Sequence, residues 1–207
     1  MRGYPTLTEA EKIWLSGIEY HEEKYGYPKK EEYIAHSRGV AWSAKCIAEN
    51  TKKLNPNKAF ILGLLHDYGK KEDEGKSGKF HGQVGYDELL AMGYNESARI
   101  CLTHSFPKRL FNNEDYSSFK PEWIIWAHKK LENIEYDDYD RLIQLCDMFF
   151  EGMEKVGYED RLNHIEVRYH LTHEQTLTAR EFSKINKKYF DDMCQKDIYK
   201  ILDIKTY

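Results

Sequence analysis

Apolar residues recur at intervals of three and four positions through almost every long segment of this chain, which is the spacing of amphipathic helices. Thr8 and Glu11 match a capping box, which predicts that the first helix begins there. The helix should pass through Trp14 and Ile18 and end near residues 26–28, where the chain reads Gly-Tyr-Pro. The opening segment is therefore expected to be helical.

Two further helices are expected to follow. The second runs from about residue 31 to residue 53, with His36 and Val40 on one stripe. Pro56 can then start a third helix, because proline is well tolerated at the first helical position. This third helix is apolar and leads directly to His66.

The rest of the chain also favours helices, with two irregular segments between them. Residues 71–80 are charged and hold two glycines, and residues 106–121 lack periodicity, so both are expected to be loops. The helices are expected at about 82–92, 95–105, 122–132 and 137–156. The tail from about 172 to 203 is polar, with a weak apolar face of Leu177, Phe182, Ile185, Tyr189 and Phe190. Because no strand pair or repeat is recognisable, we expect one all-α domain spanning residues 1–207.

Composition limits the partners of the chain. Its 31 Lys+Arg and 35 Asp+Glu leave a net charge of −4, which gives no electrostatic sign of nucleic-acid binding, a function usually marked by a basic stripe and a high pI. No apolar run approaches the roughly 18 residues of a membrane span, and the start lacks the apolar core of a signal peptide. The four cysteines form no CxxC pair, so they are expected to be reduced. A cytoplasmic protein without membrane or nucleic-acid partners is expected.

The most informative polar residues are His66 and Asp67, which follow one another at the end of an apolar helical run, LGLLHDYGKK. A carboxylate in such a place needs a compensating charge, and a metal ion is the simplest one. Lys70 lies on the same face, where a cation suits an anionic substrate beside the metal.

Other residues of metal-ligand type also stand in apolar helical stripes. They are His36, His81, His104 and Asp147. With His66 and Asp67 they make a set of imidazoles and carboxylates large enough for two metals, with Asp67 as the bridge. Such ligands suit Fe, Mn, Co, Ni or Zn better than Ca, and the absence of thiolates argues against a structural zinc site.

The remaining histidines are interpreted as bystanders, with one exception. His21 is expected on a solvated face, and His164, His170 and His173 lie in a polar stretch. His128 is the rival ligand: it could replace His104 in the site, or it could cap a packed aromatic cluster.

The order of these residues resembles a known pattern. His36, the His66-Asp67 doublet, His81, His104 and Asp147 resemble the H…HD…H…H…D pattern of the HD superfamily, and Lys70 matches its HD-x-x-K form. The resemblance covers about residues 30–155. It implies an HD-type helical bundle with its core at about 30–155, a short N-terminal helical extension and a C-terminal helical extension at about 156–207.

The resemblance also implies an activity. Members mostly hydrolyse phosphate esters and anhydrides with one or two metals, so a phosphohydrolase of the EC 3.1 or 3.6 class is expected. Its substrate would be a small phosphorylated molecule such as a nucleotide, and its nucleophile a water activated at the metal. Iron or manganese is favoured, with Zn, Ni, Co or Mg as alternatives. Asp67 and Lys70 are expected to carry catalysis, and Lys108 and Arg109 are candidates for holding a distal phosphate.

Three alternatives concern the branch of the family. The spacing from His66 to His104 is similar to the di-iron branch that cleaves diadenosine tetraphosphate symmetrically, but the segment 106–137 is longer here. A minor branch with the same ligands is a mixed-valent di-iron oxygenase. A regulatory domain that binds a nucleotide without turnover is the third possibility.

Overall fold

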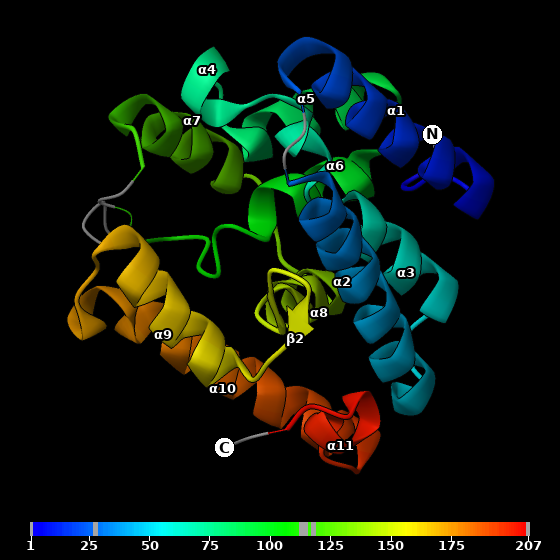
Figure 1. Cartoon of the computed structure of the whole chain (residues 1–207). Helices are drawn as coiled ribbons and strands as arrows, with labels where there is room; N and C mark the ends of the chain where they lie inside the picture. The colour runs from blue at the N-terminus through cyan, green and yellow to red at the C-terminus, as the bar shows by residue number, and fades with distance from the viewer. Residues whose placement is uncertain (1, 27–28, 112–115, 117–118, 206–207) are drawn as a thin grey trace.

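The computed structural model describes residues 2–26, 29–111, 116 and 119–205, and its regular secondary structure is almost entirely helical (Figure 1). The elements are α1 (Leu7–Tyr25), α2 (Lys30–Thr51), α3 (Pro56–Leu65), η1 (Tyr68–Lys71), α4 (Glu74–Ser77), α5 (His81–Ala91), α6 (Asn95–Thr103), α7 (Pro121–Leu131), α8 (Asp138–Asp147), β1 (Phe150–Glu151), β2 (Glu154–Lys155), α9 (Tyr158–Tyr169), α10 (His173–Cys194) and α11 (Ile198–Leu202). Within the described part of the chain, no helix has the length and apolar character that crossing a membrane requires. The predicted all-α class is confirmed.

The first helix begins earlier than predicted. Its capping box is made by Thr6 and Glu9, not by Thr8 and Glu11: the Glu9 amide donates to Thr6 Oγ1 at 3.3 Å, and the Thr6 amide donates to the Glu9 carboxylate at 2.7 Å. Two Thr-x-x-Glu registers overlap in the sequence, and the chain uses the first. Gly26 ends the helix at φ 68°, a conformation that glycine adopts without a Cβ penalty. The predicted end at Tyr27 and Pro28 lies outside the described residues.

The next two helices agree with the sequence prediction and pack tightly against each other. Pro56 occupies the start of α3, and Asn55 caps it by accepting from the next two amides. The close approach depends on Gly63, where a Cβ would lie 2.7 Å from the Ala41 Cα of α2. The backbones of α2 and α3 can therefore touch, and the end of α3 comes to lie beside the middle of α2.

Three segments differ from the prediction. The segment 71–80 is not a simple exposed loop, because it contains α4 and because Glu72 and Phe80 are buried. The helix expected at 137–156 ends at Asp147, and residues 150–155 form a two-residue antiparallel pair whose turn has Gly152 at φ 58°. Helical periodicity is read over about 11–18 residues, so it does not reveal strands of only two residues. On α10, the expected apolar face is partly wrong: Leu177 and Ile185 are exposed, whereas polar Thr176, Ser183 and Asn186 are buried with Phe190.

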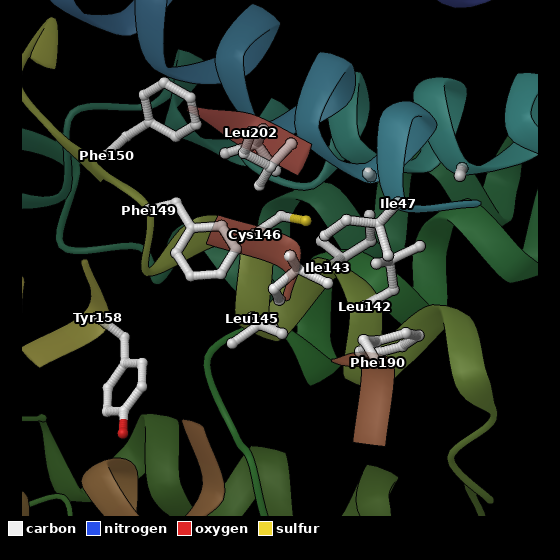
Figure 2. Close-up of a cluster of buried hydrophobic side chains, with 14 of the residues drawn as sticks. Ile47, Leu142, Ile143, Leu145, Cys146, Phe149, Phe150, Tyr158, Phe190 and Leu202 are labelled. Carbon is white, nitrogen blue, oxygen red and sulfur yellow. The ribbon is translucent and has the colours of Figure 1, made fainter. Parts of the chain in front are cut away.

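The largest core cluster surrounds α8. Figure 2 shows Ile143 and Cys146 of α8 with Ile47 of α2, Phe190 of α10 and Leu202 of α11. The C-terminal helices therefore share a core with the helices that precede them. The predicted boundary between a core at about 30–155 and an extension at about 156–207 stays a prediction.

A second cluster is aromatic and makes use of the long irregular segment. Phe106 and Phe111 of this segment are buried with Phe80 and with residues of α7. Phe106 and Phe111 stack with ring centroids 5.0 Å apart. The described start of this segment is thus packed into the protein through Phe106 and Phe111.

One contact between backbones places the residues that follow α3. A Cβ on Gly69 of η1 would lie 1.8 Å from the carbonyl oxygen of His81 and 2.6 Å from the amide nitrogen of Gly85. On α5 itself, a Cβ on Gly85 would lie 2.8 Å from Cys101 Sγ. Glycine thus lets the backbones of η1 and α5 touch, and it lets α5 pack closely on the Cys101 side chain of α6.

We expect Gly69→Ala to destabilise the protein by about 1–3 kcal/mol or more, because the added methyl group has no space between η1 and α5. Gly75→Ala in the exposed helix α4 is the control. The nearest atom to its Cβ would be a side-chain oxygen at 3.3 Å, and alanine favours helix. Urea unfolding of both variants measures the difference. Equal stability of the two variants would contradict the close packing.

Candidate metal centre

The predicted ligands come from five helices, one from the middle of its helix and the others from helix ends. His36 lies within α2, His66 caps the C-terminus of α3, and Asp67 precedes η1. His81 begins α5, His104 follows α6 and Asp147 ends α8. Ligand atoms from these residues form three groups, each within 4.8 Å: His36, His66 and Asp67; His66, His104 and Asp147; Asp67, His81 and His104.

One half of the cluster pairs two histidines with two carboxylates. The Nε2 atoms of His36 and His66 are 3.2 Å apart. Asp147 Oδ1 lies 3.0 Å from His36 Nε2 and 3.6 Å from His66 Nε2. Asp67 Oδ2 lies 3.5 Å and 3.4 Å from the same two nitrogens. Two nitrogens and two oxygens therefore converge on one point.

The other half repeats the arrangement on the second oxygen of Asp67. The Nε2 atoms of His81 and His104 are 3.2 Å apart, and Asp67 Oδ1 lies 3.6 Å and 3.4 Å from them. Ser105 Oγ is 3.1 Å from His104 Nε2. Asp67 thus stands between two pairs of imidazoles with one oxygen toward each, which is the position of a bridging ligand.

The outer nitrogens of two histidines fix the orientation of their rings. His66 Nδ1 lies 2.7 Å from the Gly63 carbonyl, and His104 Nδ1 lies 3.1 Å from the Ile100 carbonyl. A carbonyl only accepts, so each Nδ1 is the donor and each Nε2 points inward. Paired inward nitrogens 3.2 Å apart need a proton or a metal ion between them.

His81 is oriented by a carboxylate that the sequence analysis missed. Glu74 Oε1 accepts from the His81 ring at 2.5 Å and from the His81 backbone amide at 2.8 Å. Such a partner fixes the orientation of the ring. Glu74 lies in a charged segment without periodicity, so no sequence signal marked it.

The electrostatics of the cluster call for a positive charge. Burial alone would raise the pKa of Asp67, but Lys70 and His66 hold it well below its usual range. Burial alone would lower the pKa of His66, but Asp67 and Asp147 raise it to about 10. Asp67 Oδ1 is buried without a hydrogen-bond partner among the described residues. Either protons or metal ions can satisfy these groups, and the nitrogen and oxygen donors fit divalent transition metals.

Lys70 and His21 lie beside the cluster. Lys70 Nζ is 2.5 Å from Asp67 Oδ2, although the lysine side chain remains 45% exposed. His21 Nδ1 is 3.0 Å from the Lys70 carbonyl and 3.1 Å from the Lys71 carbonyl. The expectation that His21 faces solvent is wrong, because α1 packs on η1 and buries this ring. His21 therefore joins α1 to the segment that carries Lys70.

The other candidates lie elsewhere. His128 stacks on Phe111 with ring centroids 4.1 Å apart and belongs to none of the three ligand groups within the described residues. Lys108 Nζ lies over the Phe182 ring, 5.4 Å from its centroid, and Arg109 is exposed. His173 binds Glu166 on the surface, and neither His164 nor His170 joins a described ligand group. That His104 is a ligand and His128 is not stays a prediction, and the placement of the two residues favours it.

A cleft of about 480 Å³ adjoins the cluster. His36 and Lys70 line it, together with Tyr25 of α1 and Lys76 of α4. Since the candidate ligand His36 and the neighbouring Lys70 belong to the wall, a small molecule in the cleft would reach the candidate metal centre.

Glu72 holds one side of this cleft together. Its buried carboxylate accepts hydrogen bonds from the phenols of Tyr20 and Tyr25 and from the ammonium groups of Lys24 and Lys79. Burial would raise the pKa of Glu72, but these donors lower it from 4.5 to about 2. The segment after η1 is thus anchored to α1 through one ionised side chain.

A family model described as HD domain matches residues 33–150, which is more than half of the chain. No curated protein and no solved structure gives a significant match.

We expect the purified protein to carry up to two transition-metal ions per chain and Asp67→Ala to lose most of this metal, because Asp67 faces both halves of the cluster. Elemental analysis measures the content, and His173→Ala is the surface control. Wild-type protein without metal after anaerobic loading with iron or manganese would contradict the candidate site.

We also expect Glu72→Gln to lower stability at pH 7 by about 1.5–3 kcal/mol, the typical value of hydrogen bonds to a charged group. The folded pKa of Glu72 lies below the unfolded value, so the stabilisation is full above about pH 4.5 and is lost as the pH falls toward 2. Urea unfolding with a chelator present should therefore show the difference between wild type and variant shrinking in that window. A difference that stays constant down to pH 3 would contradict this account.

Proposed function

The chain belongs to the HD domain family, and we propose that it is a metal-dependent phosphohydrolase acting on a nucleotide or another small phosphate ester or anhydride. We further propose that His36, His66, His81, His104, Asp67 and Asp147 hold one or two divalent ions, with iron or manganese favoured.

The observation that carries this proposal is the place of Lys70. Its ammonium group lies 2.5 Å from Asp67 Oδ2, yet its side chain is 45% exposed and lines the cleft beside the cluster. A cation next to the ligands favours an anionic substrate over a neutral one. Phosphoryl transfer depends mainly on such positioning and charge stabilisation.

Different residues of the chain have different roles in the proposed reaction. A divalent metal supplies Lewis acidity, which activates water and polarises a phosphoryl oxygen. Lys70 stabilises the charge that develops on the phosphoryl oxygens, a role that depends on position. Glu74 and the carbonyls of Gly63 and Ile100 keep their histidines oriented, so that the ligand nitrogens need not reorganise.

A screen of the metal-loaded protein against nucleotides, dinucleoside polyphosphates and simple phosphate esters tests the proposal. We expect metal-dependent release of phosphate or of a nucleotide from at least one class. Iron-dependent oxygen consumption without any hydrolysis would instead identify the oxygenase chemistry known for the same ligand set.

We expect Lys70→Ala to lower kcat by about 10²–10³-fold while metal content and melting temperature stay nearly unchanged, because one preorganised electrostatic donor is lost. Lys71→Ala is the matched control: this lysine of the same short helix binds Glu88 at 2.6 Å. It should lose some stability and keep its turnover.

Measuring kcat, bound metal and melting temperature on one preparation separates two roles of Lys70. A fall in metal content would mean that Lys70 acts by positioning Asp67. Full activity of Lys70→Ala would contradict the proposed role in phosphoryl transfer.

A further inference from the structure

An arginine pair stands on α9, beyond the part of the chain that matches the HD domain. Arg161 Nη1 and Arg168 Nη2 each bind one oxygen of Glu151, the residue that ends β1. One carboxylate thus lies between two guanidinium groups, and one positive charge is left over. Arg161 Nε is buried and has no hydrogen-bond partner within the described residues.

Both arginines line the same cleft as His36 and Lys70. The cleft extends from the metal-ligand cluster to α9, with Gly152 of the hairpin also in its wall. In Figure 1, α9 lies at the lower left and α4, which carries Lys76, lies at the top. The cleft therefore has cations at the metal-ligand cluster and again on α9.

The acidic groups of the cleft do not neutralise this second cationic site. Glu72 accepts from two tyrosines and two lysines, and Glu74 accepts from His81. Glu32, which also lines the cleft, pairs with Lys29 at 3.6 Å. Asp73 caps α4 by accepting from the Lys76 amide at 2.9 Å. The surplus charge near Arg161 and Arg168 is thus available to a ligand.

We propose that Arg161 and Arg168 bind a second anionic group of the substrate, so that the preferred substrates carry at least two phosphate groups. This rests on the proposed function, because the first phosphate is taken to lie at the metal centre beside Lys70. Each arginine uses one terminal nitrogen on Glu151, and its remaining N–H groups form a planar fork that matches phosphate oxygens. The pair thereby selects polyphosphorylated compounds over simple monoesters.

The test is calorimetric titration of the manganese-loaded protein with two probes, inorganic tripolyphosphate and orthophosphate. We expect wild type to bind tripolyphosphate at least tenfold more tightly than orthophosphate. The Arg161→Gln/Arg168→Gln double variant should bind tripolyphosphate at least tenfold more weakly than wild type, which is about 1.4 kcal/mol. Its orthophosphate affinity should change less than twofold. Metal content is measured after each titration, so that chelation is not mistaken for binding.

Two further variants separate ligand binding from a structural role. Arg180→Gln removes an arginine that pairs with Glu166 at 2.7 Å, is as exposed as Arg161 at 16%, and does not line the cleft. It should bind both probes like wild type. Glu151→Gln breaks the same ion pairs but keeps both arginines, so tripolyphosphate should bind at least as tightly as to wild type. Weakening by Glu151→Gln equal to that of the double variant would overturn the proposal.

Hydrolysis of nucleotides, dinucleoside polyphosphates and simple phosphate esters by the same preparations keeps the two proposals apart. If the protein hydrolyses a phosphate compound but its affinity for tripolyphosphate does not depend on Arg161 and Arg168, this inference is overturned and the proposed phosphohydrolase function stands. Arginine-dependent binding without turnover of any phosphate compound removes the phosphohydrolase and leaves the anion site.

Discussion

The buried carboxylate of Asp67 needs partners that compensate its charge, and the surrounding helices are arranged so as to provide them. It is 1% exposed, and an isolated charge in such a place costs several kcal/mol. Its compensation comes from separate parts of the chain: His36 of α2, Lys70 of η1, and His81 and His104 at the ends of α5 and α6. Because each partner must lie within about 4 Å, satisfying one carboxylate requires these elements to converge at one place.

Convergence of this kind depends on helix ends. Glycines at the crossings, such as Gly69, then let the backbones approach closely enough for the rings to meet.

The sequence could predict the parts that depend on local pattern. The helices carry their own periodicity, and His66, His104 and Asp147 stand out because a polar residue ends an apolar run. Contacts between distant segments leave no such mark. Glu74 is seven residues from His81 in a charged stretch, and His21 looks solvated among its neighbours until α1 packs on η1. Helical periodicity also does not distinguish the two overlapping capping boxes, and it does not mark the two-residue strands of the hairpin after α8.

The hairpin connects the candidate metal centre with the arginine pair. Asp147 ends α8, and the chain then passes through Phe150, whose ring meets the edge of His36 with centroids 6.2 Å apart. This contact is possible because Gly39 of α2 has no Cβ; one would lie within van der Waals overlap of the Phe150 ring. Glu151 follows and receives both arginines of α9. Asp147, Phe150 and Glu151 thus follow one another along a short segment that is packed against the core. The packing of this segment therefore fixes the spacing between the candidate metal centre and the site where the arginines of α9 bind. On the proposed function, the length of anionic substrate that fits therefore depends on where this hairpin places Glu151 and the arginines that bind it.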